Sequence, residues 1–264
     1  MSSPAQARTS NRGRFYLDST GDRYWSVTTI LKAVPKPALV YWSAKEAAKC
    51  ALEDRARIDA IYGDGDGYDA ALKWIKDACW RGSRGKMDLG TAVHEAIEAW
   101  VLDKPLPEWG DDVEPFMVQF VQFLEDFEPK FLQTELTVYS RTHKYAGTLD
   151  AIVEIDGLEG FDGTATLLLD HKTGSGVYPE VALQLAAYRH AQFMEAPDGS
   201  EHEVPEVDGG AVLHLRPDGY DLIPVVCDED VHRHFLWFRE GFRWMEDVSK
   251  GVVGDAYRTP KAVS

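Results

Sequence analysis

Two apolar stretches near the middle of the chain carry carboxylates and a lysine that could hold a divalent cation and a water. Asp150 lies in the stretch 145–155, and Asp170 and Lys172 lie in the stretch 164–172. The alternation of residue types predicts a strand for each stretch, and the Gly- and Asp-rich connection predicts that the two strands pair antiparallel. Two carboxylates facing one lysine are costly to bury for packing alone, because unpaired buried charge is expensive. The pattern therefore favours a cation-binding site.

Strand geometry predicts which of these side chains meet. Residues two apart on a strand share a face, so Asp170 and Lys172 point the same way and His171 points the opposite way. Asp150 is expected on the same face as Ile152. The three charged side chains converge if the pairing brings these faces together. We therefore predict that His171, whose face points away, is a structural histidine.

Further strands and helices must position these residues. A strand over 131–140 carries Glu135, and a helix that Asp88 caps carries His94 in its first turns. The segment RGSRGK at 81–86 is predicted to be a loop before that helix, and the first dozen residues are predicted to be a flexible tail. Apolar residues at helical spacing predict the other helices over 38–61, 68–80, 113–128, 179–193 and 228–248, and hairpins are predicted over 14–25 and 211–226.

The composition is that of a globular, acidic chain. Its 264 residues are 44% hydrophobic and 11% aromatic, which is enough for a substantial core. The formal net charge of −16 excludes a protein that coats nucleic acid nonspecifically, so any DNA contact must be local. Three dispersed cysteines indicate no disulfide framework, zinc site or iron-sulfur cluster. A polar N-terminus and the lack of a bilayer-length apolar run predict a cytoplasmic protein without a membrane partner.

Four short motifs follow one another in an order that resembles a known nuclease superfamily. They are GTAVHEAIE around His94, GTLDAI around Asp150, LLLDHKTG around Asp170, and QLAAY with Gln184 and Tyr188. Each is weak alone, but the four in order resemble the PD-(D/E)XK nucleases, specifically the RecB-like branch that includes the CRISPR-associated exonucleases and many phage recombination nucleases. The resemblance covers about residues 85–195. Leu149 stands where the superfamily name has proline, and the iron-sulfur cysteines of one subgroup are missing.

The resemblance implies an α/β fold: a restriction-endonuclease-like core with a central mixed β-sheet flanked by helices, to which the chain adds an N-terminal helical lobe. Its extent, together with the helices predicted before it, divides the chain into three parts. These are an N-terminal hairpin and helical lobe over 1–84, a nuclease core over 85–250 and a C-terminal tail over 251–264.

The resemblance also implies roles for individual residues. The metal ligands would be His94, Asp150 and Asp170, the catalytic lysine would be Lys172, and the supporting residues would be Gln184 and Tyr188. Carboxylates suit Mg²⁺ or Mn²⁺, and an added imidazole shifts the preference toward Mn²⁺. Lys172 would position or deprotonate a water for attack on a phosphodiester. Glu135 could be either a partner of the ligands or a solvated strand carboxylate.

The predicted activity is that of a divalent-metal-dependent DNA exonuclease, which hydrolyses phosphodiester bonds in phage or mobile-element DNA recombination and repair. Two alternatives remain open: a catalytically silent DNA-end-binding scaffold subunit, and a structure-selective endonuclease on the same core. The expected partners are DNA, as ends, duplex or single strand, and a recombination partner protein.

Basic residues near the predicted site are candidates for contact with the DNA backbone. They are Arg81, Arg84 and Lys86 before the His94 helix, and Arg141 and Lys144 before the Asp150 strand. The N-terminus of the predicted His94 helix would add partial positive charge to the first group. Solvated turns explain these residues equally well.

Overall fold

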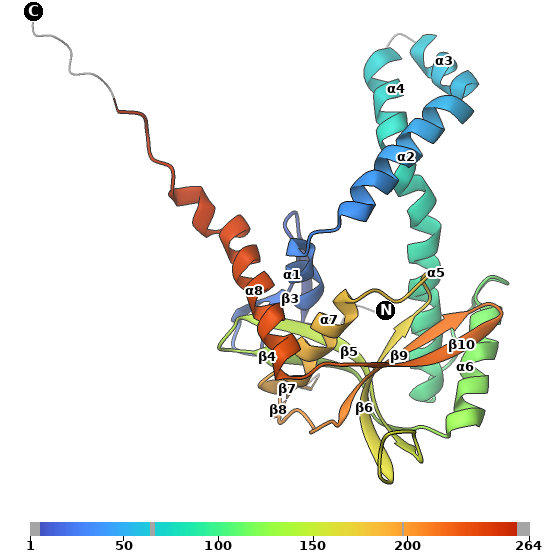
Figure 1. The fold of residues 1–264 in the computed structure, drawn as a ribbon, viewed down its shortest axis with the longest axis vertical. Helices are drawn as coiled ribbons and strands as arrows, with labels where there is room; N and C mark the ends of the chain where they lie inside the picture. Colours follow the sequence, from blue (N-terminus) through green and yellow to red (C-terminus); the bar gives the residue numbers. More distant parts are fainter. Residues whose placement is uncertain (1–5, 64–66, 197, 258–264) are drawn as a thin grey trace, which may run out of the picture.

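The computed structural model describes residues 6–63, 67–196 and 198–257, and it is an α/β fold with a mixed sheet flanked by helices, which confirms the predicted class (Figure 1). The strands are β1 (Ala7–Ser10), β2 (Gly13–Leu17), β3 (Arg23–Ser26), β4 (Lys130–Ser140), β5 (Tyr145–Asp156), β6 (Thr164–Lys172), β7 (Phe193–Glu195), β8 (Glu201–His202), β9 (Gly209–Arg216) and β10 (Gly219–Val225). The helices are α1 (Val27–Ile30), α2 (Pro37–Glu53), α3 (Arg55–Gly63), α4 (Gly67–Lys76), α5 (Ala78–Val101), α6 (Glu114–Phe127), α7 (Glu180–Arg189) and α8 (Glu229–Glu246), with 3₁₀ turns η1 (Leu31–Ala33) and η2 (Val248–Gly251).

Strand β5 is the centre of the sheet, and one of its edges is shared by two partners. Along one edge β5 pairs antiparallel with β4. On the other, β3 pairs in parallel with Tyr145 and Ala146, whereas β6 pairs antiparallel from Ala151 onward. The predicted antiparallel pairing of β5 and β6 is thus confirmed. Residues 147–150 lie between the two partners, at a fork in the sheet.

Strand β6 leaves β5 at this fork and continues beside another strand. The last pair between β5 and β6 is Ala151 with Leu169, and from there β6 stays paired in parallel with β9 as far as Lys172. The residues next to the last pair, on the side where the strands separate, are Asp150 and Asp170. The fork therefore puts the two predicted carboxylates at the opening between diverging strands.

Two hydrophobic cores cover the two faces of the sheet. Residues of α1, α7 and α8 pack on one face with Leu149 and Ile152, and residues of α5 and α6 pack on the other with Ala151 and Val153. Leu149 and Ile152 are three residues apart and still share a core, so the strict alternation of faces is interrupted between them. The regular alternation from which Asp150 was placed on the face of Ile152 therefore does not hold along this stretch.

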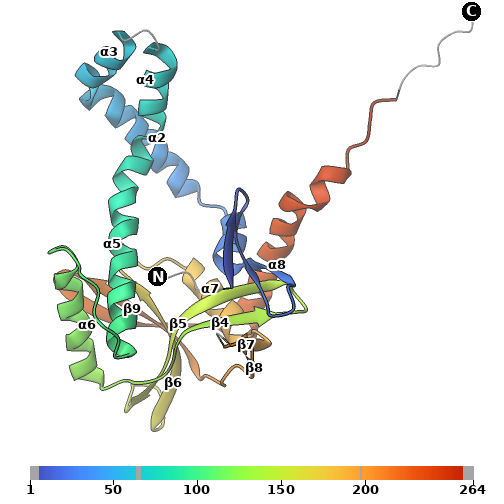
Figure 2. The same ribbon diagram turned by 180° about the vertical axis from the view of Figure 1, so that it is seen from behind.

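Helices α2, α3 and α4 form an arm that stands away from the sheet, and α5 runs from this arm down to the sheet (Figures 1 and 2). The predicted loop over 81–86 is wrong, because these residues lie inside α5. The predicted domain boundary after residue 84 also falls within this continuous helix. The helix predicted over 38–61 is divided at Asp54 into α2 and α3. None of the described helices is both long and apolar enough to cross a bilayer.

The N-terminal segment belongs to the sheet. Residues 7–10 form β1, which pairs with β2 from Ala7 to Ser10, so the tail predicted for the first dozen residues is wrong over this part. The predicted hairpin of β2 and β3 is confirmed. Because β3 pairs with β5, this hairpin extends the central sheet rather than the helical arm.

A cluster of aromatic rings fixes α8 to the sheet. His232 of α8 is buried, its Nε2 lies 3.0 Å from the Tyr145 hydroxyl, and its ring stacks on His190 at 4.8 Å between centroids. Burial, with added repulsion from His190 and His143, lowers the pKa of His232 to about 4. His232 is therefore neutral in the folded protein at neutral pH.

We expect acid to destabilise the fold partly through His232. Its folded pKa of about 4 lies below the ordinary value of 6.5, so the unfolded chain binds more protons between these values and stability falls as the pH drops from 6.5 toward 4. His232→Gln keeps a hydrogen-bonding group near Tyr145 but cannot be charged. The variant should lose less stability than the parent between pH 7.5 and pH 5, by on the order of 1 kcal/mol, in urea unfolding at both pH values. Equal losses in both proteins would contradict this.

Candidate metal centre and catalytic groups

Asp150 is the centre of the candidate site. Its side chain is 7% exposed, and its Oδ2 accepts a hydrogen bond of 2.8 Å from the backbone N–H of His171. That N–H is free to bond a side chain because β5 and β6 have separated at the fork. The fork thus explains both where Asp150 lies and how its carboxylate is held.

His94 reaches Asp150 from α5 on the other side of the opening. Its Nε2 lies 3.0 Å from the backbone carbonyl oxygen of His171. A carbonyl only accepts, so Nε2 carries the proton, and in the neutral imidazole Nδ1 carries the lone pair. Nδ1 lies 3.6 Å from Asp150 Oδ2, is buried and has no hydrogen-bond partner among the described residues. Two electron-rich atoms therefore face each other across a gap in which a cation fits.

His171 completes a group of three ligand atoms. Its Nδ1 lies 3.8 Å from the same Asp150 oxygen, and one donor atom from each of His94, Asp150 and His171 lies within 4.8 Å of the others. Burial lowers the pKa of His171 to about 4, although Asp150 opposes this, so the ring is neutral and can offer a lone pair. The His171 side chain points away from Lys172, as predicted. Asp150 lies at the fork, where its carboxylate is close to the His171 ring as well.

Asp170 lies beside this group and is held by two other side chains. Its Oδ1 accepts a hydrogen bond of 2.7 Å from Gln184 Nε2, and its Oδ2 lies 2.6 Å from Lys172 Nζ. Burial raises the pKa of Asp170 to about 6, with Asp150 adding to the rise and Lys172 opposing it. Asp170 was predicted as a metal ligand, and the described donor group contains His171 instead.

Lys172 stays positively charged in this arrangement. Burial alone would lower its pKa, but the carboxylates of Asp170 and Asp150 outweigh burial and raise it above the ordinary value. Burial would raise the pKa of Asp150, but the charges of His94 and His171 when they are protonated in acid, and then that of Lys172, outweigh burial and hold this pKa below its usual range. Lys172 is thus suited to donate a hydrogen bond from an ammonium and is a poor base.

Tyr188 packs against the start of the Asp150 motif from α7. The tyrosine is 3% exposed, and its Cζ and hydroxyl oxygen lie 3.0 Å from where a Cβ on Gly147 would be. Only glycine leaves room for this ring, which gives the glycine of GTLDAI a physical role. Gln184 and Tyr188 lie one turn apart on α7; Gln184 contacts Asp170 directly, and Tyr188 packs on the backbone of β5 three residues before Asp150.

We expect Gly147→Ala to displace Tyr188 and with it the α7 residues that face the site. Forcing a methyl group into this contact should lower the free energy of unfolding by about 1 to 3 kcal/mol. Gly85→Ala in α5 is the matched control, because its added Cβ would meet nothing within 4 Å. Thermal melts of both variants test this, and a Gly147→Ala protein as stable as the parent would contradict it.

Glu135 adds a further carboxylate near Asp150, and Glu98, which pairs with Lys104, lies near Glu135. Glu135 lies on β4 with a left-handed backbone, at φ 55°, a conformation that is strained for a residue with a Cβ. Burial, then repulsion from Asp150 and Glu98, raises the pKa of Glu135 to about 8. Glu98 lies one turn after His94 on α5, and this i, i+4 spacing is the signal that could have included it in the predicted site.

The predicted DNA-contact residues are engaged within separate parts of the chain. Arg81 packs over Trp74 in the arm, whereas Arg141 is ion-paired with Glu201. Lys144 Nζ lies 2.8 Å from Asp22. The side chains of Arg84 and Lys86 lie outside what the structure describes. Helix α5 begins at Ala78 and includes residues 81–86, so no helix begins after this segment at Asp88, and the contribution expected from a helix N-terminus there is wrong.

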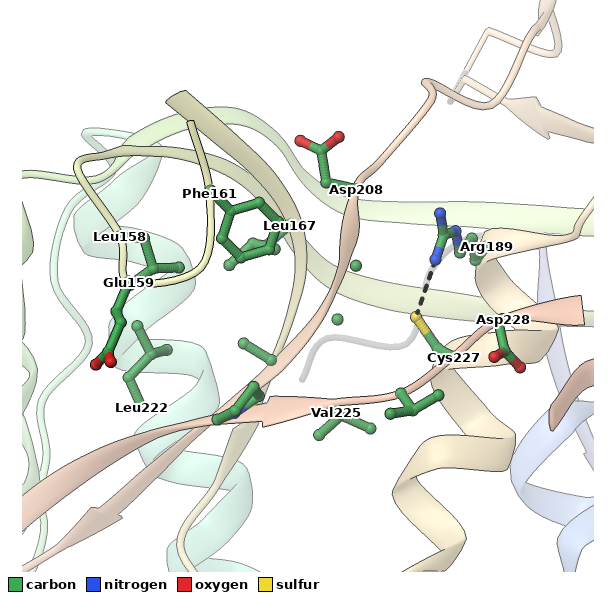
Figure 3. Close-up of a pocket in the computed structure, with 15 residues that line it drawn as sticks. Leu158, Glu159, Phe161, Leu167, Arg189, Asp208, Leu222, Val225, Cys227 and Asp228 are labelled. Atoms are coloured by element: carbon green, nitrogen blue, oxygen red, sulfur yellow. Dashed lines mark hydrogen bonds between the residues drawn. The ribbon is translucent and has the colours of Figure 1, made fainter. Parts of the chain in front are cut away.

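A larger cavity, of about 720 Å³, lies elsewhere on the sheet (Figure 3). Leu167, Leu222 and Val225 give it apolar walls, and Arg189 donates a 3.9 Å hydrogen bond to Cys227 Sγ at its edge. None of the predicted site residues that the structure describes lines this cavity. The chemistry proposed below therefore belongs to the fork and not to this cavity.

Comparison with known proteins identifies no family for this chain. No family model matches it, and no curated protein matches it. Among solved structures it is similar to SSO0001, known from a crystal structure, with 16% identity over 52% of this chain and 59% of that chain and a TM-score of 0.28. The match spans less than two thirds of that protein's length, and so low a TM-score establishes no shared function.

Proposed function

We propose that this protein is a divalent-metal-dependent DNA nuclease, acting as an exonuclease in phage or mobile-element recombination and repair. The observation that carries the proposal is the buried pair of His94 Nδ1 and Asp150 Oδ2, 3.6 Å apart with no described hydrogen-bond donor between them. His171 Nδ1 faces the same oxygen. The ion-paired Lys172 stands beside this donor group, as the resemblance to RecB-like nucleases leads us to expect.

The donor set fits a divalent cation. Two imidazole nitrogens and one carboxylate favour Mn²⁺ over Mg²⁺, because Mg²⁺ prefers oxygen ligands. The His94 Nε2 bond to a carbonyl fixes the ring with its lone pair toward the donor group, as the second nitrogen of a metal-bound histidine commonly does. When bound, the ion would supply Lewis acidity toward a phosphodiester and an attacking water.

The remaining side chains act on the reacting groups. The Lys172 ammonium donates hydrogen bonds to the water or to the phosphate, and Asp170 fixes its position through the 2.6 Å contact. Gln184 in turn orients Asp170 from α7. Because Lys172 is held charged, we propose that it positions and stabilises rather than removes a proton.

DNA is the proposed substrate, and the host or bacterial cytoplasm is the proposed location. A recombination protein that works on the same DNA ends is the proposed partner. A silent end-binding subunit would not need two imidazoles facing Asp150, so the buried donor group favours the enzyme. A structure-selective endonuclease would use the same groups and is the second candidate.

Cleavage assays separate these candidates. End-labelled linear DNA and covalently closed circular DNA are each incubated with Mn²⁺, with Mg²⁺ and with a chelator. We expect digestion of linear DNA only, supported better by Mn²⁺ than by Mg²⁺ and abolished by the chelator. Cutting of closed circles would support the endonuclease, and no cleavage of any substrate would leave only a binding role.

A further inference from the structure

Two adjoining cavities lie between Lys172 and the end of α8. The inner cavity, of about 240 Å³, is lined by Lys172 together with Thr28, Leu31 and Lys36. The outer cavity, of about 490 Å³, is lined by the same Thr28, Leu31 and Lys36 and reaches Met245 at the end of α8. Because the cavities share these three residues, they adjoin along α1 and η1, between Lys172 and the end of α8. We call the two adjoining cavities the α1 groove.

Lysines line the α1 groove along its whole length. Lys172 stands at its inner end, Lys36 where the cavities meet, and Lys32 in the outer cavity. Lys36 Nζ lies 3.1 Å from Glu180, whereas Lys32 is exposed and makes no ion pair with any other described residue. Glu180 also lines the inner cavity, and Asp170 pairs with Lys172, so Lys32 supplies the positive charge of the groove that no described carboxylate balances. Lysines so placed attract phosphate groups and gain affinity by releasing counterions.

The floor and rim of the α1 groove are suited to bases. Leu31, Val34, Val177 and Val181 make the lining apolar, and Tyr178 at the rim is 64% exposed. A duplex keeps its base faces stacked inside and presents phosphates and sugars outward. A single strand offers phosphates to lysines and free base faces to an aromatic ring at the same time. The combination of lysines, an apolar floor and an exposed tyrosine therefore matches a single strand.

We infer that the α1 groove binds a single DNA strand and leads it to Lys172. This inference rests on the proposed nuclease function and specifies its substrate. Phosphates contact Lys32 and Lys36, and a base stacks on Tyr178. A duplex must then be opened before one of its strands reaches the site.

Binding measured without cleavage tests the inference. Fluorescence anisotropy compares a labelled oligothymidine of about twelve nucleotides with a duplex of the same length, in chelator. We expect the single strand to bind at least about tenfold more tightly. The double variant Lys32→Gln/Lys36→Gln should weaken this binding and flatten the plot of log affinity against log salt by about 1.4, which is about 0.7 for each lost phosphate contact. Tyr178→Ala should weaken it about five- to a hundredfold, and Tyr178→Phe should not.

The matched control is Lys49→Gln/Lys130→Gln, which removes two exposed, ion-paired lysines that do not line the groove. An unchanged salt slope in the groove variant, an equal loss in the control, or duplex binding as tight as that of the single strand would each overturn the inference. If the parent cleaves DNA while the groove variants bind single strands normally, the groove assignment fails and the nuclease stands. If the groove binds single strands but the parent cleaves nothing with Mn²⁺, the binding site stands and the nuclease fails.

Discussion

Replacing Lys172 with alanine is expected to lower the rate of DNA cleavage by at least about a hundredfold while Mn²⁺ binding is retained. The side chain lies beside the donor group and is not one of its three ligand residues. Its ammonium is held 2.6 Å from Asp170 and kept charged, so its loss removes a preorganised hydrogen-bond donor and leaves the donor group in place. Single-turnover cleavage of end-labelled DNA at saturating Mn²⁺ measures the effect on chemistry alone.

The fold should survive this substitution. Without Lys172, Asp170 keeps its hydrogen bond from Gln184, and its already raised pKa lets it become a neutral acid. Lys130→Ala, which removes an exposed lysine on β4, is the control and should cleave at the parent rate. Near-normal turnover in the Lys172→Ala protein would refute the catalytic role of Lys172.

Millimolar Mn²⁺ is expected to raise the melting temperature of the parent and to leave that of Asp150→Asn unchanged. An ion present at ten- to a hundredfold its dissociation constant adds about 1.4 to 2.7 kcal/mol to the free energy of unfolding. The ion is expected to bind between His94 Nδ1 and Asp150 Oδ2. Asparagine at position 150 lacks the negative charge that would hold the ion there. Because two of the three donors are imidazoles, Ca²⁺ and Mg²⁺ should stabilise less than Mn²⁺.

Thermal scans with chelator and with each ion measure this. Asp218→Asn is the matched control, since its carboxylate is 90% exposed and is not part of the donor group, and it should respond to Mn²⁺ as the parent does. An equal Mn²⁺ shift in parent and Asp150→Asn would show that the ion binds elsewhere on the acidic surface. The candidate metal centre would then have to be abandoned.

Local pattern was enough to predict the strands that carry the site, and it was not enough to predict how they meet. The alternation in 145–155 and 164–172 and the turn residues between them led to β5 and β6 almost residue for residue. The fork depends on β3 and β9, which are distant in sequence and compete for the edges of β5 and β6. No local sequence signal predicts that competition. The prediction that the side chains of Asp150, Asp170 and Lys172 meet was therefore made without knowing that the two strands separate there.

The same limit applies to His171, which was predicted to be structural and lies in the candidate donor group. His171 was assigned a structural role because alternation turns it away from Lys172, and alternation was right about the direction. The fork lets one carboxylate meet both faces, as the contacts of Asp150 with His94 and His171 show. Neighbouring titratable residues at the end of a buried strand, such as Asp170 and His171, can therefore belong to one site even when alternation places them on opposite faces.

The glycines in residues 81–86 led to the wrong prediction of a loop. They are typical of loops, yet this segment is helical within α5. Helix α5 is continuous over 24 residues and contacts α2 and α4 of the arm as well as α6 and β4 of the core. Gly85 has no packing reason to lack a side chain, and glycine lowers helix stability by about 1 kcal/mol relative to alanine. The section of α5 with the lowest intrinsic helix stability thus lies between the arm and His94, whereas Gly90, nearer His94, lies so close to Thr173 that an added Cβ would be 3.1 Å from its hydroxyl oxygen.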